Sequence, residues 1–496
     1  MRRLLPTLGL LLAAALPACQ GEQDQAGPDP DAWGIPAIPA YDPAFEQAFS
    51  LDRVDAFHLA FTVDEWNGLL HDHDQNPRNE IYRRADFTVG GTTLAAVGVR
   101  LRGNTWSRTR PEAGSGLHDP AHALVRAHFK IKFNETFDGD EGVYGAPSID
   151  LPELPGNAGR TWATLRGVNL KQNRGDTTYL REVMAYDTFR RAGVQAPRAA
   201  FVRLYVRIGD EPERYMGVLE LIEDLDKEWV KRRFGGNGFL FKSLWQAQGP
   251  ADLTRTDGDG SPDSGRVGLE KTDPADAAEA AGWNNDWSPY RPAYDLKTQE
   301  DRFPEAEAEL DQLIGLLAGT PHRASLEAAI DVQSLLRAQA VNALVGMADD
   351  YWRNGNNYYL LQAPDGRWRF IPYDYDLTFG FDCIGAPTHS SPFVAWGETH
   401  NAGMTPRLME AVLAVPEFRE DYRRYVAELV AGEEPVFRWT TLGPRFQAAG
   451  ALVGPLTAGT EALAESPYDG SLAWVEWFVG QRVSTAEAEM ADLLPP

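Results

Sequence analysis

The chain has 496 residues, of which 43% are hydrophobic and 14 are Trp, enough for a large packed core. At roughly 150 residues for each domain, this length predicts two or three folded units. The net charge of −25 argues against a general nucleic-acid-binding protein, because a phosphate backbone needs a cationic surface. It still allows a small phosphate-bearing ligand held by a few local cations. The only cysteines, Cys19 and Cys383, predict no disulfide framework.

Residues 1–19 read as a targeting segment. Two arginines follow Met1, and the apolar run at 4–16 is too short to span a bilayer as a mature helix. The run ends in Leu-Pro-Ala-Cys19, which resembles a bacterial lipobox, in which the cysteine is lipidated after cleavage. The alternative is an ordinary secretory signal. Either way we expect an extracytoplasmic protein, lipid-anchored to the cell envelope or secreted, with residues 20–40 as a Gly- and Pro-rich linker.

Residues 41–223 are predicted to be rich in strands. Period-two alternation or β-rich composition marks segments 54–62, 85–89, 92–102, 128–134, 162–172, 199–208 and 213–222, with a short helix at 62–70. The turn Arg102-Gly103-Asn104 follows a strand, and its backbone N–H groups are placed to approach an anion; an ordinary turn is the alternative. Lys130 and Lys132 fall on one face of their strand.

A helix at 177–191 is predicted to follow the cap residue Asp176. Its Glu182 lies close to the apolar face, and a buried carboxylate needs a cation as partner. Lys171 or Lys130 can supply that cation, unless Glu182 reaches solvent at the helix edge.

Residues 224–496 are predicted to be mainly helical. Helices are expected at 227–234, within 301–349, and at 404–433, 437–464 and 471–494, with a short strand at 239–242. Residues 248–292 form an acidic insertion rich in Gly and Pro. Within it, residues 257–263 have the alternating oxygen ligands of a Ca²⁺ loop, although a surface loop is the alternative.

Residues 346–380 are predicted to form a β-hairpin with polar groups at its open end. Strands at 357–361 and 367–371 flank a Pro-Asp-Gly turn at 364–366. Folding about this turn brings together a set of carboxylate and amide side chains: Asp349, Asp350, Asn357, Asp374 and Asp376. Such oxygen ligands suit Mg²⁺ or Mn²⁺. The alternative is a polar loop that only caps a hairpin.

The order of these groups indicates phosphoryl transfer. A strand-rich half supplies Lys and Glu, and a helical half then supplies Asp, Asn and Asp. These are the groups that hold phosphates, bind the bridging metal and accept the proton of an acceptor hydroxyl. The usual protein-kinase motifs GxGxxG, HRD and DFG are absent from the sequence.

These segments resemble the spore coat protein H (CotH) kinase family, an atypical branch of the kinase-like fold. The resemblance rests on residues 97–104, 128–133, 179–187, 190–197, 217–223, 357–360 and 371–380, the last segment being the most specific. This chain has Arg126-Ala-His128 where the family often has Lys-Lys-Ser. The resemblance implies an α+β, two-lobed fold, with a β-rich N-lobe at 41–223 and a helical C-lobe at 224–496.

The resemblance also implies roles for the residues of the hairpin. Asp376 would bind metal, with Asp374 as the alternative. Asn357 would be the second metal ligand, with Asn356 as the alternative. Asp350 would be the catalytic base, with Asp349 as the alternate.

The strand-rich half would bind the nucleotide. Glu182 would form the helix ion pair with Lys130, Lys132 or Lys171. Residues 102–104 would lie over the phosphates, and the segment from Glu223 to Asp226 would be the hinge beside the adenine.

Three functions are consistent with this pattern. The first is an exported protein kinase that uses ATP with Mg²⁺ or Mn²⁺ to phosphorylate Ser or Thr of exported proteins, acting as a monomer. The second is a catalytically inactive, kinase-like surface protein for binding or adhesion. The third is an enzyme of the same fold that transfers AMP instead of phosphate.

Overall fold

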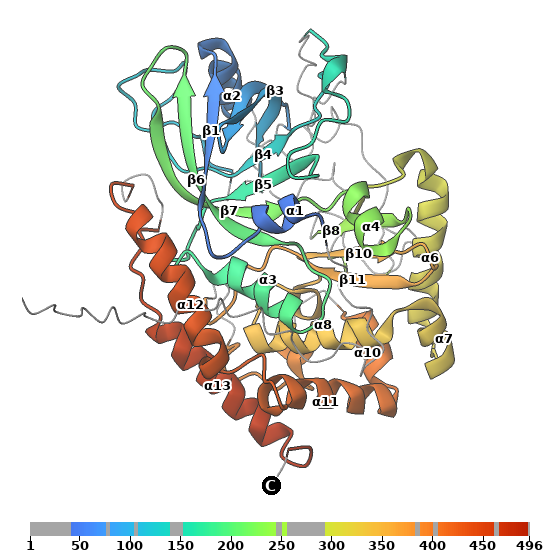
Figure 1. Ribbon diagram of the computed structural model, residues 1–496. Helices are drawn as coiled ribbons and strands as arrows, with labels where there is room; N and C mark the ends of the chain where they lie inside the picture. The colour runs from blue at the N-terminus through green and yellow to red at the C-terminus, as the bar shows by residue number, and fades with distance from the viewer. Residues whose placement is uncertain are drawn as a thin grey trace, which may run out of the picture.

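The computed structural model describes residues 41–75, 80–103, 108–138, 152–244, 250–254, 293–381, 387–399, 405–460 and 466–494. The targeting segment with Cys19, the linker, Asn104 and the calcium-type loop at 257–263 lie outside these residues. The described fold is a mixed α+β arrangement, with a strand-rich part above a helix-rich part in Figure 1.

Seven strands close into a barrel in the order β1-β2-β3-β4-β5-β7-β6. The closing contact is a parallel pairing of β1 with β6, from Asp55 opposite Val202 to Phe61 opposite Ile208. Alternate side chains fill the interior, because successive residues of a strand face opposite sides. The strands are β1 (Asp55–Phe61), β2 (Arg83–Val89), β3 (Thr92–Leu101), β4 (Phe129–Lys132), β5 (Gly167–Lys171), β6 (Ala199–Ile208) and β7 (Arg214–Glu223).

A second sheet contains the predicted hairpin, which is confirmed. It has four strands in the order β11-β10-β8-β9. Tyr358 lies opposite Pro372 and Gln362 opposite Trp368, about a turn in which Gly366 takes a φ of 82°. The hairpin is not isolated, because β8 pairs along β10. The strands are β8 (Phe239–Ser243), β9 (Tyr294–Leu296), β10 (Tyr358–Gln362) and β11 (Trp368–Pro372).

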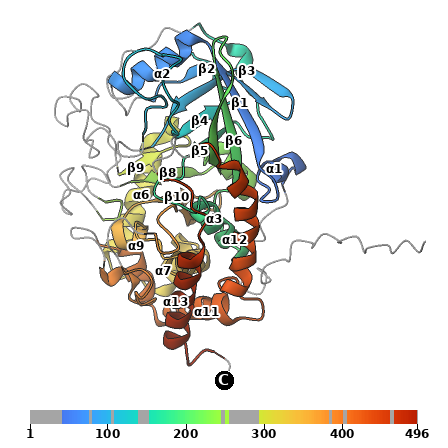
Figure 2. The ribbon, with the colours of Figure 1, turned by 90° about the vertical axis from the view of Figure 1, so that its left-hand side faces the viewer.

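Most described helices lie below the barrel (Figures 1 and 2). They are α1 (Pro43–Ala48), α2 (Val63–Gln75), α3 (Arg181–Arg191), α4 (Lys227–Phe234), α6 (Phe303–Ala318), α7 (Arg323–Ala329), α8 (Val332–Val345), α9 (Tyr351–Asn354), α10 (Arg407–Leu413), α11 (Pro416–Ala431), α12 (Trp439–Val453) and α13 (Ala473–Glu489). Among the described helices, none has the length and hydropathy needed to cross a bilayer. Helix α3 contacts both β6 and α8, so it lies where the barrel meets the helices.

Three predicted helices have different bounds in the structure. Helix α3 begins at Arg181 and not at 177, because Tyr179 has a φ of 60°, which a helix does not accept. The predicted helix at 404–433 is split into α10 and α11 before Pro416, since a residue that precedes Pro avoids the helical conformation. Helix α12 ends at Val453, ahead of a Gly-Pro pair that forms a short 3₁₀ turn.

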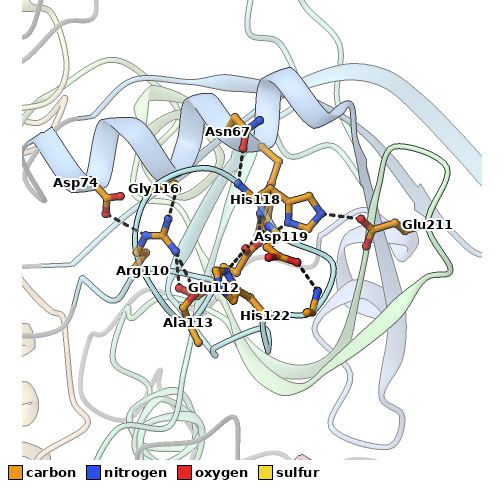
Figure 3. Close-up of polar contacts among 12 residues, drawn as sticks. Asn67, Asp74, Arg110, Glu112, Ala113, Gly116, His118, Asp119, His122 and Glu211 are labelled. Carbon is orange, nitrogen blue, oxygen red and sulfur yellow. Dashed lines mark hydrogen bonds and ion pairs between the residues drawn. The ribbon is translucent and has the colours of Figure 1, made fainter.

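A buried histidine ties the loop after β3 to the barrel (Figure 3). The ring of His118 lies between Glu112 and Glu211, with each ring nitrogen 2.7 Å from a carboxylate oxygen. Glu112 also accepts hydrogen bonds from Trp66 Nε1 at 2.8 Å and from the Asp119 backbone N–H at 3.0 Å. Burial lowers the pKa of His118, but the two carboxylates outweigh it and raise the pKa above 6.5. Both ring nitrogens therefore carry protons, and the imidazolium joins α2, the loop and the β6–β7 turn.

We expect His118→Gln to destabilise the fold at pH 6 and much less at alkaline pH. The pKa of His118 is higher in the folded protein than in the unfolded chain, where it is about 6.5. The charged ring therefore contributes its full stabilisation below pH 6.5, and this contribution is lost as the pH rises through the pKa of the folded state. Hydrogen bonds to charged groups suggest a loss of roughly 1–3 kcal/mol at pH 6. Urea denaturation of both proteins across this pH range measures the difference. An equal difference at every pH would contradict the charged form of His118.

Candidate active site

The candidate site begins at the end of β5, where Lys171 is the last strand residue. All five residues of β5 are buried, and Lys171 lies opposite Glu220 of β7 in the barrel. Its side chain is only 6% exposed. A buried ammonium needs carboxylate partners, and the structure supplies them from two other elements.

The first partner is Glu182, in the first turn of α3. Asp176 fixes this helix start, since its carboxylate accepts hydrogen bonds from the backbone N–H groups of Leu180 and Arg181, each at 2.9 Å. Glu182 is 1% exposed, and its Oε2 contacts Lys171 Nζ. Of the three lysines that the sequence offered as its partner, the structure brings Lys171 to Glu182.

The second group of partners follows β11. Lys171 Nζ contacts Asp374 Oδ1 and lies 3.7 Å from Asp376 Oδ2. Asp374 has a φ of 63°, and its backbone N–H donates to the hydroxyl of Tyr186 on α3 at 2.8 Å. The exit of the hairpin is thus fixed to the helix that carries Glu182.

Three carboxylates meet at this point, and their oxygens suit a cation. Glu182, Asp374 and Asp376 each offer an oxygen within 4.8 Å of the others. The side chains of Asp374 and Asp376 are 38% and 40% exposed, so a ligand in solvent can reach them. These three carboxyl groups share one buried lysine, so together they can carry more negative charge than that lysine offsets. This donor set fits a divalent metal ion such as Mg²⁺ or Mn²⁺.

The pKa values of the two aspartates move in opposite directions. Burial favours the neutral form of Asp374, but Lys171 outweighs it and lowers the pKa of this carboxyl below its usual range. Burial and the neighbouring Asp374 and Glu182 raise the pKa of Asp376 to about 8, against the opposing effect of Lys171. Lys171 therefore compensates Asp374, whereas Asp376 stands to gain most from an added cation.

Asp349 lies between α8 and α9, next to a row of asparagines. Its carboxylate accepts hydrogen bonds from Asn356 Nδ2 at 3.3 Å, from Asn357 Nδ2 at 2.8 Å and from Asn354 Nδ2. Asn357 also donates to the Asp349 carbonyl at 2.9 Å. Because Asn357 uses Nδ2 for both of these hydrogen bonds, its amide oxygen is the atom suited to a metal. Asp349 is half-buried, and burial raises its pKa to about 6.

Asp350 is fully buried and stabilises the fold around α9. Its carboxylate accepts from the Arg353 backbone N–H at 2.7 Å, from Trp396 Nε1 at 3.0 Å and from Asn342 Nδ2. These bonds cap the short helix α9 and join it to α8 and the Trp396 turn. Asp350, which the sequence favoured as the catalytic base, is thus held in contacts within the fold. Asp349, the alternate, is the more accessible of the pair.

The other two candidate lysines are paired elsewhere. Lys130 Nζ lies 2.9 Å from Asp224, and Lys132 Nζ lies 2.7 Å from Glu135. Both residues belong to β4 and not to the end of β5.

The predicted phosphate-side and hinge residues also occupy defined positions. Arg102 donates to the hydroxyl of Tyr373, and Asp374 contributes to its electrostatic surroundings. The carbonyl of Gly103 accepts from Arg108 at 2.8 Å. The side chain of Glu223 is fully buried and pairs with Arg232 and Arg233, so its carboxylate joins the end of β7 to α4.

Sequence reasoning did not identify Tyr186 or His128 as part of the site. Tyr186 lies four residues after Glu182 on α3, and this spacing puts both on one helix face, which is the signal that could have found it. His128 precedes β4, and its ring contacts the backbone of Gln172, next to Lys171. Nothing in the sequence around His128 indicates that contact, because it depends on the pairing of β4 with β5.

Comparison with known proteins gives one family. Residues 100–457 match the family model described as CotH kinase protein. No curated protein matches significantly. One similar solved chain comes from the Shewanella oneidensis MR-1 toxin–antitoxin system HipA, HipB and its operator DNA complex, with 14% identity. The match covers 66% of this chain and 59% of that chain, so it spans less than two thirds of the latter. Its TM-score is 0.28, and a likeness at that level carries no argument.

Proposed function

The chain belongs to the CotH kinase protein family, and we propose that it is a metal-dependent, atypical protein kinase. In this proposal it transfers the γ-phosphate of ATP to Ser or Thr of secreted or cell-envelope proteins. The family model covers most of the chain and supports kinase-type chemistry. A two-lobed arrangement, with residues 41–223 over residues 224–496, is part of the same proposal.

The observation that carries the proposal is the position of Lys171. Its ammonium joins a helix glutamate, Glu182, to Asp374 at the exit of a hairpin. Phosphoryl transfer by kinases needs a lysine on the phosphates, a helix glutamate that orients it, and an aspartate that holds metal beside it. Elements far apart in the sequence supply these groups at one point.

The residues divide into roles by their contacts. Asp374 and Asp376 would hold the metal, with the amide oxygen of Asn357 as a further ligand. A bound Mg²⁺ or Mn²⁺ would supply positive charge that offsets the negative charge of the phosphates. Lys171 would bind phosphate oxygens, and Glu182 would keep its ammonium in place. Asp349 would accept the proton of the acceptor hydroxyl, since it is half-buried and ionised above a pKa of about 6.

A direct test is a transfer assay with the purified protein. γ-Labelled ATP, Mg²⁺ or Mn²⁺, and an exported acceptor protein should give a labelled acceptor. Intact-mass analysis of the acceptor distinguishes phosphate from AMP, because the two added groups differ greatly in mass. Failure to transfer either group with any metal would contradict an enzymatic function and favour the inactive, surface-binding alternative.

Nucleotide should stabilise the protein only in the presence of metal. A ligand that binds the folded state alone stabilises it by about 2.7 kcal/mol at 100 times its Kd. We therefore expect the unfolding temperature to rise with ATP and Mn²⁺ together and to rise little with ATP alone. Differential scanning fluorimetry measures this. An unchanged unfolding temperature under both conditions would indicate a scaffold without a nucleotide site.

We expect Asp349→Asn to lower kcat by about 100-fold or more, the usual range for a lost general base. Because an ionised base is needed, kcat of the wild type should rise with pH through about 6, as the pKa of Asp349 implies. Asp350→Asn is the matched control. The Asp350 carboxylate accepts three hydrogen bonds, and the NH₂ group of an asparagine there would face a donor instead of accepting from it. This change should cost about 1–3 kcal/mol of stability, while the folded fraction stays active. The opposite pattern, with only the Asp350 variant inactive though folded, would make Asp350 the base.

The location of the protein is also a proposal. Residues 1–19 support export, and Cys19 supports attachment to the envelope through lipid. Cys19→Ser should then release the protein from the membrane fraction without changing its transfer activity. This would place the kinase beside exported acceptors.

A further inference from the structure

A buried histidine lies beside the proposed phosphate-binding lysine and has a polar atom without a partner. His128 is 4% exposed and immediately precedes β4. Its carbonyl accepts from the Arg102 backbone N–H at 3.1 Å. On the other side, the Gln172 backbone N–H donates to His128 Nδ1 at 3.3 Å. The ring is therefore held between the end of β3 and the residue that follows Lys171.

These contacts determine which nitrogen carries the proton. A backbone N–H only donates, so Nδ1 must accept, and the proton of the neutral ring lies on Nε2. The ring is neutral, because burial and the nearby charges of Lys171 and Arg102 lower the pKa of His128 well below its usual value. Among the described residues, Nε2 has no hydrogen-bond partner. A buried N–H donor without an acceptor is unfavourable, and such a group in a native fold calls for an explanation.

The surroundings of the ring indicate the kind of acceptor that is missing. Lys171, Arg102 and Arg174 contribute positive potential at His128, against one negative contribution from Asp374 that is smaller than those of Lys171 and Arg102. An acceptor that enters this position from solvent gains most if it is an anion with oxygen atoms. We propose that His128 Nε2 donates a hydrogen bond to a phosphate oxygen of the bound nucleotide. This assignment rests on the proposed kinase function and adds a neutral donor to the charged groups already described.

Two substitutions separate the donor from the structural contact. His128→Asn keeps an oxygen near Nδ1 that can accept from Gln172, but it ends short of Nε2. His128→Gln reaches the position of Nε2 and can donate there. If the donor binds phosphate, the Asn variant should bind ATP with Mg²⁺ roughly 10- to 100-fold more weakly, and the Gln variant should stay close to wild type. A merely structural role would give the Asn variant lower stability instead of selectively weaker binding.

Calorimetry with three ligands tests this assignment. Inorganic triphosphate with Mg²⁺ should lose affinity for the Asn variant as ATP does, whereas adenosine should bind all three proteins alike. Equal ATP affinity of the wild type and the Asn variant would overturn the role of His128 and leave the kinase proposal intact. If the Asn variant bound adenosine as much more weakly as it bound ATP, that result would also overturn the role of His128. Wild-type protein that binds triphosphate through His128 but transfers no phosphate would contradict the kinase function alone. Binding of neither triphosphate nor ATP would overturn both.

Discussion

Lys171→Met should lower phosphate transfer by roughly 1000-fold, which is the upper end for the loss of one preorganised charge. Lys171 is the buried cation that contacts both Glu182 and Asp374. Methionine fills similar space but removes the ammonium that would bind phosphate oxygens. Single-turnover transfer at saturating ATP and Mn²⁺ measures the effect on chemistry apart from binding.

The two lysines of β4 are matched controls for this experiment. Lys130 pairs with Asp224 and Lys132 with Glu135, so Lys130→Met and Lys132→Met should each keep transfer within about tenfold of wild type. Loss of activity in the Lys130 variant equal to that in the Lys171 variant would assign phosphate binding to β4 and contradict our assignment.

Lys171→Met should also lower the stability of the fold. Without Lys171, the carboxylate of Glu182 is buried and has lost its cation. Removing one partner of a buried ion pair costs about 3–5 kcal/mol. Adding Glu182→Gln to the Lys171 variant should recover part of this loss while transfer stays low. Urea denaturation of the single and double variants separates the structural effect from the catalytic one.

The sequence predicts the local elements well because their signals are local. The turn about Gly366 and the alternation on either side give the hairpin of β10 and β11. The cap residue Asp226 and the glycine after Phe234 give α4 its bounds. The closure of the barrel could not be predicted in this way. The parallel pairing of β1 with β6 joins segments about 150 residues apart, and the local sequence of neither strand encodes its partner.

The site could be predicted as a set of residue types but not as a set of contacts. Which lysine meets Glu182 depends on the order of strands in the barrel, where β5 lies between β4 and β7. Neither the spacing nor the composition near Lys130 and Lys171 encodes that order. Asp349 and Asp350 are adjacent in the sequence, yet only Asp350 caps α9, since its carboxylate meets the Arg353 N–H.

Asp374→Asn and Asp376→Asn should each weaken Mn²⁺ binding and lower transfer by roughly 100- to 1000-fold, the range for loss of one group that stabilises transition-state charge. Each substitution replaces a carboxylate of the proposed metal site by a neutral amide, and carboxylates are the ligands that Mg²⁺ and Mn²⁺ prefer. Asp365→Asn is the matched control on the same hairpin. Asp365 lies at the opposite end, where it pairs with Arg367 and Arg369, so its loss should leave Mn²⁺ affinity and transfer unchanged.

Metal should also offset the pH dependence of stability that Asp376 gives to the fold. Its pKa of about 8 in the folded chain lies above the ordinary value of 3.8. The folded state therefore binds an extra proton between these values, and the stability of the metal-free protein should fall as pH rises from about 4 to 8. Asp376→Asn should remove this pH-dependent loss of stability. In the wild type, Mn²⁺ should offset the loss most at about pH 8, where the Asp376 carboxylate ionises. Unfolding temperatures with Mn²⁺ and with a chelator measure both effects. An Asp376→Asn variant that gains as much stability from Mn²⁺ as the wild type would place the metal elsewhere.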